Sequence, residues 1–465
     1  MTLGRVEHPL RSLLLAVGWA DAPVERLIVE ERPKVLATPW PIAPMATAAL
    51  GAVGLAVSRI QELRSGKVSS VAVDTRAAEV AMASSSYLMV NGRPAKFRDP
   101  FTGFYPAADG EWVYLHGNFP HLRDGLLNML SVGKDPEEVR AAVASRCAYD
   151  IEAEAIRLGL CAARVRSRDA WVSERESVEG GSGSPISLER LASGPVKPFG
   201  HACGGPLGGL RMLDLSRVIA GPMAGRTMAE HGASVIRIAG ANLPSITSLV
   251  IDTGFGKRSA FIDLETEEGR TQLRTLARDA DIYLDAYRPS SLDQRGFGAS
   301  ALGEFNPSLV SVSLSAFSKE GSWQSRRGYD SLVQATTGMA LDGLSDRPAL
   351  LPCQPLDYLS GYLAAFAAMV ALIRRHETGG RWHAAMSLSA TAEWMWQMRA
   401  DLGDDPLQPH ANPGHAEVSD LMEGFDTAFG HVRALRPALR FDGYPTAWTS
   451  LPVPLGTHAA VWPDM

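Results

Sequence analysis

The most constraining feature of this 465-residue sequence is an alternation of short apolar runs and amphipathic segments that begins at residue 209. The run LRMLDLS predicts a buried strand, VIAGPMAGRTMAEHG predicts a turn that opens a helix, and ASVIRIAG predicts a second strand. RSAFIDL, EEGRTQLRTLARDA, DIYLDAY and LVSVSLSAF continue with a strand, a helix and two strands. Residues 209–315 therefore predict an open, doubly wound α/β domain with a mostly parallel sheet, inside a large domain that spans 209–400.

A smaller unit precedes this large domain. Residues 101–175 combine strand-like alternation in DGEWVYL with three helical patterns and a closing strand, CAARVRS, which is typical of a small α+β domain. Residues 176–208 are dense in Gly, Pro and Ser, so we expect a connector there rather than packed elements. Residues 401–465 follow the large domain as a C-terminal tail.

Composition excludes several classes of protein. A net charge of −6 with mixed signs leaves no basic stripe, so we expect small-molecule partners rather than nucleic acid. The four cysteines, Cys147, Cys161, Cys203 and Cys353, lack CxxC spacing and predict reduced thiols. The apolar run from Leu13 to Trp19 is too short for a signal peptide or a membrane span. We therefore expect a soluble cytoplasmic protein without membrane contact.

An internal repeat relates residues 36–80 to residues 350–394 without a gap, at the constant offset 357 − 43 = 314. Both segments have a Pro, an Ala-rich helical stretch, a Gly that stops it (Gly66 and Gly380), a basic residue and a strand-like run. Identities are few, and two unrelated Ala-rich helices are the alternative explanation. The repeat predicts matching helix–strand units related by an approximate two-fold axis.

Successive runs of the chain resemble the motifs of CoA-transferase family III, the CaiB/BaiF group of formyl-CoA transferase and carnitine CoA-transferase. They are LRMLDLSRVIAGPMAGRTMAEHGASVIRIAG, GKRSAFIDLETEEGR, DAYRPSSLDQRGFG, FNPSLVSVSLSAFSKEGSW and RGYDSLVQATTGMA, in the order of the family. DGEWVYLHGNFPHL through LGLCAARVRSRDAW resembles the family's small domain. SLPVPLGTH resembles its closing segment, which implies a tail that returns to the core.

The order of the domains differs from that of the family, which places its small domain after the nucleophile. Here the small domain comes first, so the resemblance implies a truncated tandem fusion in which residues 1–100 are a degenerate first copy. The chain would then be a pseudo-dimeric monomer, and a further homodimer stays open.

The resemblance implies that Asp357, in QPLDYLSGY, is the catalytic nucleophile. Its place after Pro355 predicts the first turn of a helix, where the helix dipole and free backbone amides would keep the carboxylate ionised. Such a carboxylate can attack an acyl-CoA thioester and pass through an anhydride and an aspartyl-CoA thioester, with CoA as the cofactor and no metal. A helix N-cap is the alternative role. The repeat has Ala43 in the same place, which predicts one active site per chain.

The resemblance also implies contacts with CoA from the turn SRVIAGP, from the basic pair in GKRSA near the adenosine phosphates, and from residues further along. These are Val218, Ala220, Gly221, Lys257, Arg258, Tyr287, Arg295, Arg327 and Tyr329. Ala239 and Gly240 stand where the family has acidic and other nucleotide contacts, and Ala286 replaces the Asn of its ENF motif. These departures predict altered CoA contacts.

Two histidines of the small domain, His116 and His121, are candidates for the site, with a surface role as the alternative. Cys353 is expected to be a buried apolar residue.

Two other functions stay open at this point. An α-methylacyl-CoA racemase shares the fold but has GHD where this chain has GYD, and the phenol of Tyr329, with an ordinary pKa of about 10, is a poor base. A lyase on the same fold is a related alternative. A non-catalytic paralogue that binds acyl-CoA is the second. The sequence does not identify the acyl donor or acceptor.

Overall fold

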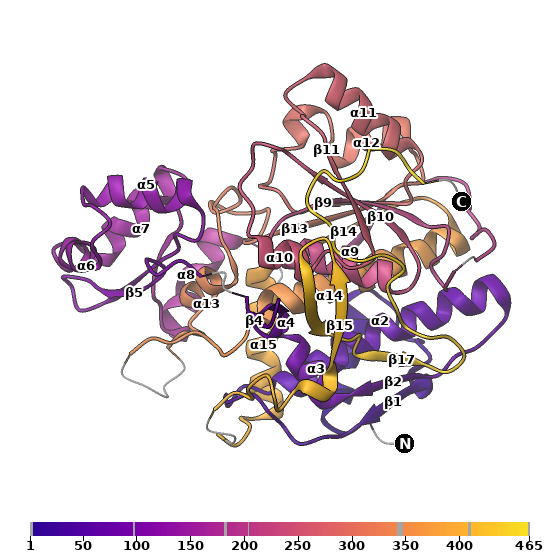
Figure 1. Cartoon of the computed structure of the whole chain (residues 1–465), viewed down its shortest axis with the longest axis horizontal. Helices are drawn as coiled ribbons and strands as arrows, with labels where there is room; N and C mark the ends of the chain where they lie inside the picture. Colours follow the sequence, from indigo (N-terminus) through magenta and orange to yellow (C-terminus); the bar gives the residue numbers. More distant parts are fainter. Residues whose placement is uncertain are drawn as a thin grey trace.

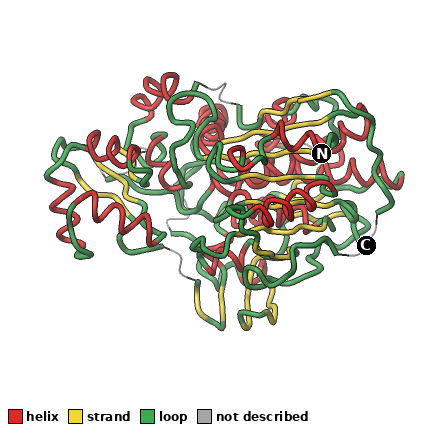
Figure 2. Tube along the Cα trace, turned by 90° about the horizontal axis from the view of Figure 1, so that it is seen from above, coloured by secondary structure: helices red, strands yellow, loops and turns green. Residues whose placement is uncertain are grey.

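The computed structural model describes residues 3–95, 98–180, 184–202, 204–341, 347–407 and 411–463. Cys203 lies outside these ranges. A main body built around a large sheet carries a small domain on one side (Figure 1). Figure 2 shows the strands of the main body running between layers of helices.

The main sheet has seven strands in the order β11-β10-β9-β12-β13-β14-β8, all parallel except β8. They are β8 (Ser187–Ala192), β9 (Arg211–Leu215), β10 (Ser234–Ala239), β11 (Lys257–Phe261), β12 (Ile282–Asp285), β13 (Val310–Ser315) and β14 (Arg381–Ser387). In chain order the six parallel strands have the 3-2-1-4-5-6 arrangement of a doubly wound sheet, which confirms the predicted fold class. The connector prediction for residues 176–208 is wrong in part, because β8 pairs with β14 at the sheet edge.

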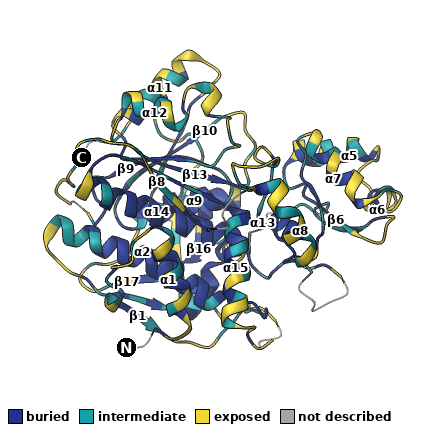
Figure 3. Cartoon of the chain, turned by 180° about the vertical axis from the view of Figure 1, so that it is seen from behind, coloured by how far each residue is buried: buried dark blue, intermediate teal, exposed yellow. Residues whose placement is uncertain are grey.

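Helices cover both faces of this sheet. They are α9 (Ala220–Glu230), α10 (Thr247–Asp252), α11 (Glu267–Arg278), α12 (Ala299–Phe305), α13 (Asp330–Thr336), α14 (Pro355–Thr378) and α15 (Leu388–Leu402). Alternate residues of each strand point to opposite faces. Met212 and Val235 therefore join the core under α9 and α14, whereas Leu213 and Ile236 join the core under α11 and α12. Figure 3 shows α14 and α9 buried at the centre of the protein.

The first hundred residues form a second layer against α14. Their elements are α1 (Glu7–Ala16), β1 (Leu27–Glu30), α2 (Ile42–Ser65), β2 (Val71–Asp74), α3 (Thr75–Ala81) and α4 (Ser84–Tyr87). β1 and β2 are parallel, and β17 (Leu439–Phe441) from the end of the chain adds to β2 antiparallel. Short 3₁₀ helices occur at Gly4–Val6, Val24–Arg26, Asp293–Arg295 and Ser419–Leu421.

The two repeat segments have the same order of elements: a 24-residue helix, a strand and a second helix. α2 and α14 pack against each other, and Ala43 and Asp357 both lie in the first turn of their helices. Descent from a fusion remains a prediction. Both helices are long and apolar enough to cross a membrane, yet 94% and 100% of their most apolar stretches are buried inside the protein.

The small domain consists of an antiparallel sheet in the order β5-β6-β7 and the helices around it. Its elements are β5 (Gly103–Pro106), β6 (Trp112–Leu115), α5 (Pro120–Leu130), α6 (Pro136–Ala144), α7 (Ala148–Arg157), β7 (Ala162–Arg164) and α8 (Arg168–Glu179). A separate apolar core links the sheet to α5, α6 and α7. Residues 101–175 therefore have the α+β organisation expected from the sequence.

The C-terminal segment returns to the body in two ways. β15 (Met422–Thr427) and β16 (Gly430–Leu435) form a hairpin that pairs with β3 (Met89–Val90) and, through it, β4 (Arg93–Pro94). Residues 450–458 then run along β11, where the amide of Gly256 donates to the carbonyl of Ser450 and the amide of His458 to that of Ser259, both at 2.8 Å. The hairpin was not expected from the sequence.

Candidate active site

A cavity of about 740 Å³ opens at the carboxyl ends of the parallel strands. It lies where β9 and β12 are neighbours, because the chain winds outward in one direction after β9 and in the other after β12. Doubly wound sheets bind ligands at this switch point, and the volume is in the range of ligand pockets. Eight of the ten residues predicted for the site line this cavity. They are Val218, Ala220, Gly221, Tyr287, Arg295, Arg327, Tyr329 and Asp357.

Lys257 and Arg258 do not line the cavity, which corrects the expectation for this pair. Lys257 is 3% exposed, and its ammonium group donates to Asp214 Oδ2 at 2.7 Å and to the carbonyl of Pro222 at 2.6 Å. Burial lowers its pKa to about 8. Arg258 lies on β11 beside the returning tail, near His458. Lys257 therefore joins β11 to β9 and α9 in the interior.

The turn between β9 and α9 brings backbone close to the cavity. Val218 has φ of 69°, in the left-handed region that β-branched residues rarely adopt. Gly221 is required by close packing, because a Cβ there would lie 2.3 Å from Ser216 Cβ and 3.0 Å from Ala286 Cβ. The turn therefore combines a strained backbone with side chains too small to fill the space beside it, which are features of a ligand-binding turn.

Asp357 is the third residue of α14 and is 7% exposed, at the cavity wall. Its carboxylate has no hydrogen bond to any part of the protein that the structure describes. Burial and the neighbouring carboxylate of Asp330 raise its pKa well above the usual value. The amides at the helix terminus do not stabilise the ionised form of Asp357 as expected, because they donate to a different carboxylate.

That carboxylate belongs to Asp330, the first residue of α13. Its Oδ2 accepts from the backbone amides of Leu356 at 2.8 Å and Asp357 at 3.1 Å, and its Oδ1 accepts from Gln334 Nε2 at 2.5 Å. Gln334 Oε1 in turn accepts from the amide of Leu351 at 2.9 Å. Asp330 thus caps α14 from outside and fixes the backbone of Asp357. Burial raises the pKa of Asp330 to about 6.

The small domain reaches the cavity through aromatic contacts with Tyr329. The ring of His116 stacks on Tyr329 with centroids 4.1 Å apart, and Phe119 lies 5.8 Å from the same ring. His116 is 4% exposed and does not line the cavity, and burial lowers its pKa to about 3, so it is neutral. His121 does line the cavity and lies 3.5 Å from Arg327. His121 therefore lies in the cavity wall, whereas His116 is buried against Tyr329.

Cationic side chains gather around the cavity. Besides Arg295 and Arg327, it is lined by Arg217, whose guanidinium lies 5.3 Å from the ring of Phe119, and by Arg288. Arg295 forms an ion pair with the exposed Glu265, which follows β11. A cavity rich in arginines suits phosphate groups, which guanidinium groups bind bidentately.

Several residues in or next to the cavity wall were missed by reasoning from the sequence. Arg217 and Arg288 lie within quoted motifs, but an isolated arginine carries no signal of where it points. Asp330 closes the GYD motif, and its role depends on a contact with residues 26 and 27 positions later. Ala239, Gly240 and Ala286 also line the cavity, so the positions that depart from the family pattern do face the ligand space. Cys353 is buried, as expected.

Comparison with known proteins shows similarity to one family over about half of the chain. The sequence model of CoA-transferase family III matches residues 207–432. A probable fatty acyl-CoA transferase of Mycobacterium tuberculosis is 31% identical over 255 residues, covering 49% of this chain and 64% of the relative. A succinate–glutarate CoA-transferase of Agrobacterium fabrum is 31% identical over 205 residues, covering 39% and 51%. Residues 207–432, just under half of the chain, are thus similar to CoA-transferase family III.

Coverage of the relatives is partial. An acyl-CoA transferase of Gibberella moniliformis is 27% identical over 420 residues, covering 77% of this chain and 73% of the relative. A solved CaiB/BaiF family protein from Brucella suis is 28% identical with a TM-score of 0.39, covering 49% of this chain and 65% of that one. The chain thus spans about half to three quarters of the length of these relatives. Within the described ranges, no group of three or more His, Cys, Asp or Glu side chains could hold a metal ion.

Proposed function

We propose that this chain transfers CoA from an acyl-CoA thioester to a carboxylic acid, with Asp357 as the nucleophile. The observation that carries the proposal is the position of Asp357: a carboxylate without hydrogen bonds to the described protein, in the wall of a cavity at the switch point of the sheet. The arginines around the same cavity fit the phosphates of CoA. The names of the relatives agree with this chemistry.

The transfer proceeds through four exchanges at Asp357. Its ionised carboxylate attacks the thioester carbonyl, the C–S bond breaks, and CoA leaves as the thiolate from a mixed anhydride. The thiolate attacks the aspartyl carbonyl of this anhydride, which releases the donor acid and leaves an aspartyl-CoA thioester. The acceptor carboxylate then attacks that thioester and expels the thiolate. The thiolate attacks the acceptor's carbonyl, which forms the new acyl-CoA and frees Asp357.

The surroundings of Asp357 affect its reactivity in two opposing ways. A carboxylate with a raised pKa is a stronger nucleophile once ionised, because its charge is poorly solvated in the buried wall. The same environment reduces the ionised fraction at low pH. Asp330 contributes to both effects, and it also holds the backbone amide of Asp357 in place. We therefore assign Asp330 a positioning role.

The racemase alternative has less support. Such a reaction needs a base opposite Asp357, and the aromatic ring in the position of the histidine is that of Tyr329. Burial raises the pKa of Tyr329 above its already high ordinary value, so its phenol is a still poorer base at neutral pH. Trapping and exchange experiments distinguish the non-catalytic alternative from CoA transfer.

The test is trapping and exchange with the full-length chain. Wild type incubated with acyl-CoA donors and hydroxylamine should yield a hydroxamate at Asp357, identified by peptide mass spectrometry, and should exchange labelled CoA into acyl-CoA. Asp357→Asn should lose both. Asp263→Asn, at another carboxylate in the cavity wall, should retain exchange within threefold. CoA binding without adduct or exchange would favour the non-catalytic paralogue and refute the proposal.

A further inference from the structure

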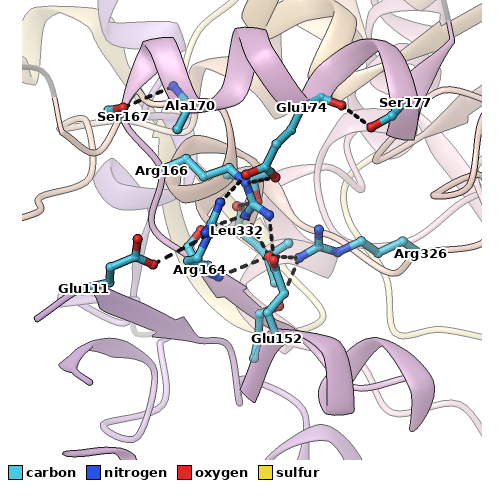
Figure 4. A network of polar contacts seen from close by, with 12 residues as sticks. Glu111, Glu152, Arg164, Arg166, Ser167, Ala170, Glu174, Ser177, Arg326 and Leu332 are labelled. Atoms are coloured by element: carbon cyan, nitrogen blue, oxygen red, sulfur yellow. Dashed lines mark hydrogen bonds and ion pairs between the residues drawn. The ribbon is translucent and has the colours of Figure 1, made fainter. Parts of the chain in front are cut away.

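A buried network of arginine and glutamate side chains joins the small domain to the segment that precedes α13 (Figure 4). At its centre is Glu152 of α7, which is 3% exposed. Its carboxylate accepts from Arg166 at 2.9 and 2.6 Å and from Arg326 at 2.8 Å. Arg166 comes from the small-domain side, just after β7, and Arg326 comes from the main body. One carboxylate thus bridges two buried guanidinium groups across the domain boundary.

Arg326 depends on this carboxylate. It is 7% exposed, its guanidinium lies 3.9 Å from the ring of Trp323, and Nη2 also donates to the carbonyl of Ala162 at 3.1 Å. Within the described ranges no other carboxylate pairs with it, and its Nη1 has no hydrogen-bond partner. Burial opposes the charge of Glu152, but Arg326 and Arg166 outweigh burial and lower its pKa to about 2. Removal of Glu152 would leave a buried cation without its counter-charge, which proteins tolerate poorly.

The segment held in this way leads directly to the candidate site. Arg326 opens the run Arg326–Tyr329, and all four residues of this run line the cavity. The next residue is Asp330, which caps α14 and fixes the backbone of Asp357. Asp330, which positions the nucleophile, therefore follows the anchored Arg326 by only four positions in the chain.

We infer that Glu152, a residue of the small domain that does not itself line the cavity, positions residues 326–330 and through them the nucleophile. It acts by neutralising Arg326 and by tying this segment to α7. The kinetic consequence rests on the proposed function, whereas the structural consequence for residues 326–330 does not. Two expected CoA contacts, Arg327 and Tyr329, lie within this segment, whereas the others come from the loops after β9 to β12. The loss should therefore appear in turnover more than in CoA affinity.

The same network offers a matched control. Glu174 of α8 accepts from Arg166 Nε at 2.9 Å and also pairs with Arg164, and its side chain is 34% exposed. It makes no contact with Arg326 among the contacts of the described residues. Glu174→Gln therefore removes one carboxylate from the network and leaves the ion pair between Glu152 and Arg326 intact.

The test compares Glu152→Gln, Glu174→Gln and wild type as full-length chains. Amide hydrogen exchange in peptides covering 323–330 should be at least tenfold faster in Glu152→Gln and unchanged in Glu174→Gln, with β9 and β10 peptides unchanged in both. In the transfer assay kcat should fall at least tenfold for Glu152→Gln, with Kd for CoA by calorimetry within threefold of wild type. Equal exchange in the two variants at 323–330 would overturn the inference.

A second variant covers a failure of Glu152→Gln to fold. Glu152→Gln combined with Arg326→Gln removes the unpaired cation together with the acid, so it should fold and still show faster exchange at 323–330 and reduced kcat. A double variant with wild-type exchange and turnover would refute the positioning role. If wild type itself transfers no CoA, the proposed function fails, and the exchange comparison alone still decides whether Glu152 anchors the segment.

Discussion

Replacing Asp330 by Asn tests the interplay of the two neighbouring carboxylates. The change removes the negative charge beside Asp357 but keeps an oxygen for the amides of Leu356 and Asp357. Loss of a like charge favours the ionised form of Asp357, so its pKa should fall. We expect the acidic limb of the kcat/KM profile to move to lower pH by about 1 unit, equivalent to about 1.4 kcal/mol. Arg98, near Asp330, and the Tyr329 phenol are unchanged in this variant.

The same substitution has a calculable effect on stability. The folded pKa of Asp330, about 6, is raised above its unfolded value, so its ionisation destabilises the fold by about 3 kcal/mol at pH 8, an effect absent below about pH 4. In Asp330→Asn the amide nitrogen would face Gln334 Nε2, which now donates to Oδ1, and this mismatch costs about 1 kcal/mol. The variant should therefore be more stable than wild type by about 2 kcal/mol at pH 8 and less stable at pH 4.

Urea denaturation at pH 4 and pH 8, together with the pH–rate profile, measures both effects. Asp330→Ala is the control, because it leaves the amides of Leu356 and Asp357 unpaired and should destabilise the fold by about 2–4 kcal/mol at pH 4, where the charge of Asp330 plays no part. An acidic limb that stays in place in Asp330→Asn would refute the electrostatic part of the reasoning. A variant as unstable as Asp330→Ala would refute the assignment of the capping oxygen.

Three further substitutions probe other parts of the structure. Lys257→Met should destabilise the fold by about 3–5 kcal/mol, because Asp214 is left buried without its partner. A tenfold loss of CoA affinity at unchanged stability would instead show that Lys257 belongs to the ligand site. Glu79→Gln should be more stable than wild type by about 2 kcal/mol at pH 8 but not at pH 5. Burial raises the folded pKa of Glu79 to about 7, so its charge costs about 3 kcal/mol at pH 8, while an amide nitrogen facing the amide of Val35 or Leu36 costs about 1 kcal/mol. Equal pH dependence of the two proteins in denaturation would contradict this. Gly221→Ala should lower stability by about 1–3 kcal/mol in thermal unfolding through its clash with Ser216, and an unchanged Tm would show that the turn relaxes freely.

The main sheet could be predicted from the sequence because its signals are local. Each strand of residues 209–315 is a short apolar run next to a helical pattern, and period alone separates the two. β8 has no such signal in the sequence. All six of its residues are exposed or partly exposed, so no buried face marks it as a strand. Its position at the sheet edge is set by pairing with β14, nearly two hundred residues later, which no local pattern reports.

The candidate site likewise has residues that could be placed from the sequence and residues that could not. Asp357, Val218 and Gly221 were placed through the resemblance to the family. Their positions after a strand end or at the start of a helix agree with it, since such positions meet at one edge of a parallel sheet. Lys257 was misplaced because the resemblance put it near the adenosine phosphates, whereas here its ammonium group compensates the buried Asp214. The protonation of Asp357 depends on Asp330, a contact between two helices that sequence spacing does not encode.

The interleaving of the two ends of the chain has a consequence for how the protein is made. β2 needs β17 as its neighbour, and α2 packs on α14, more than three hundred residues later. During synthesis the apolar faces of the first hundred residues therefore stay exposed until α14 and β17 have been synthesised. Contacts of such wide separation form slowly, and the waiting segment presents a long apolar helix to solvent. Burial of this N-terminal layer therefore depends on segments that are synthesised more than three hundred residues later.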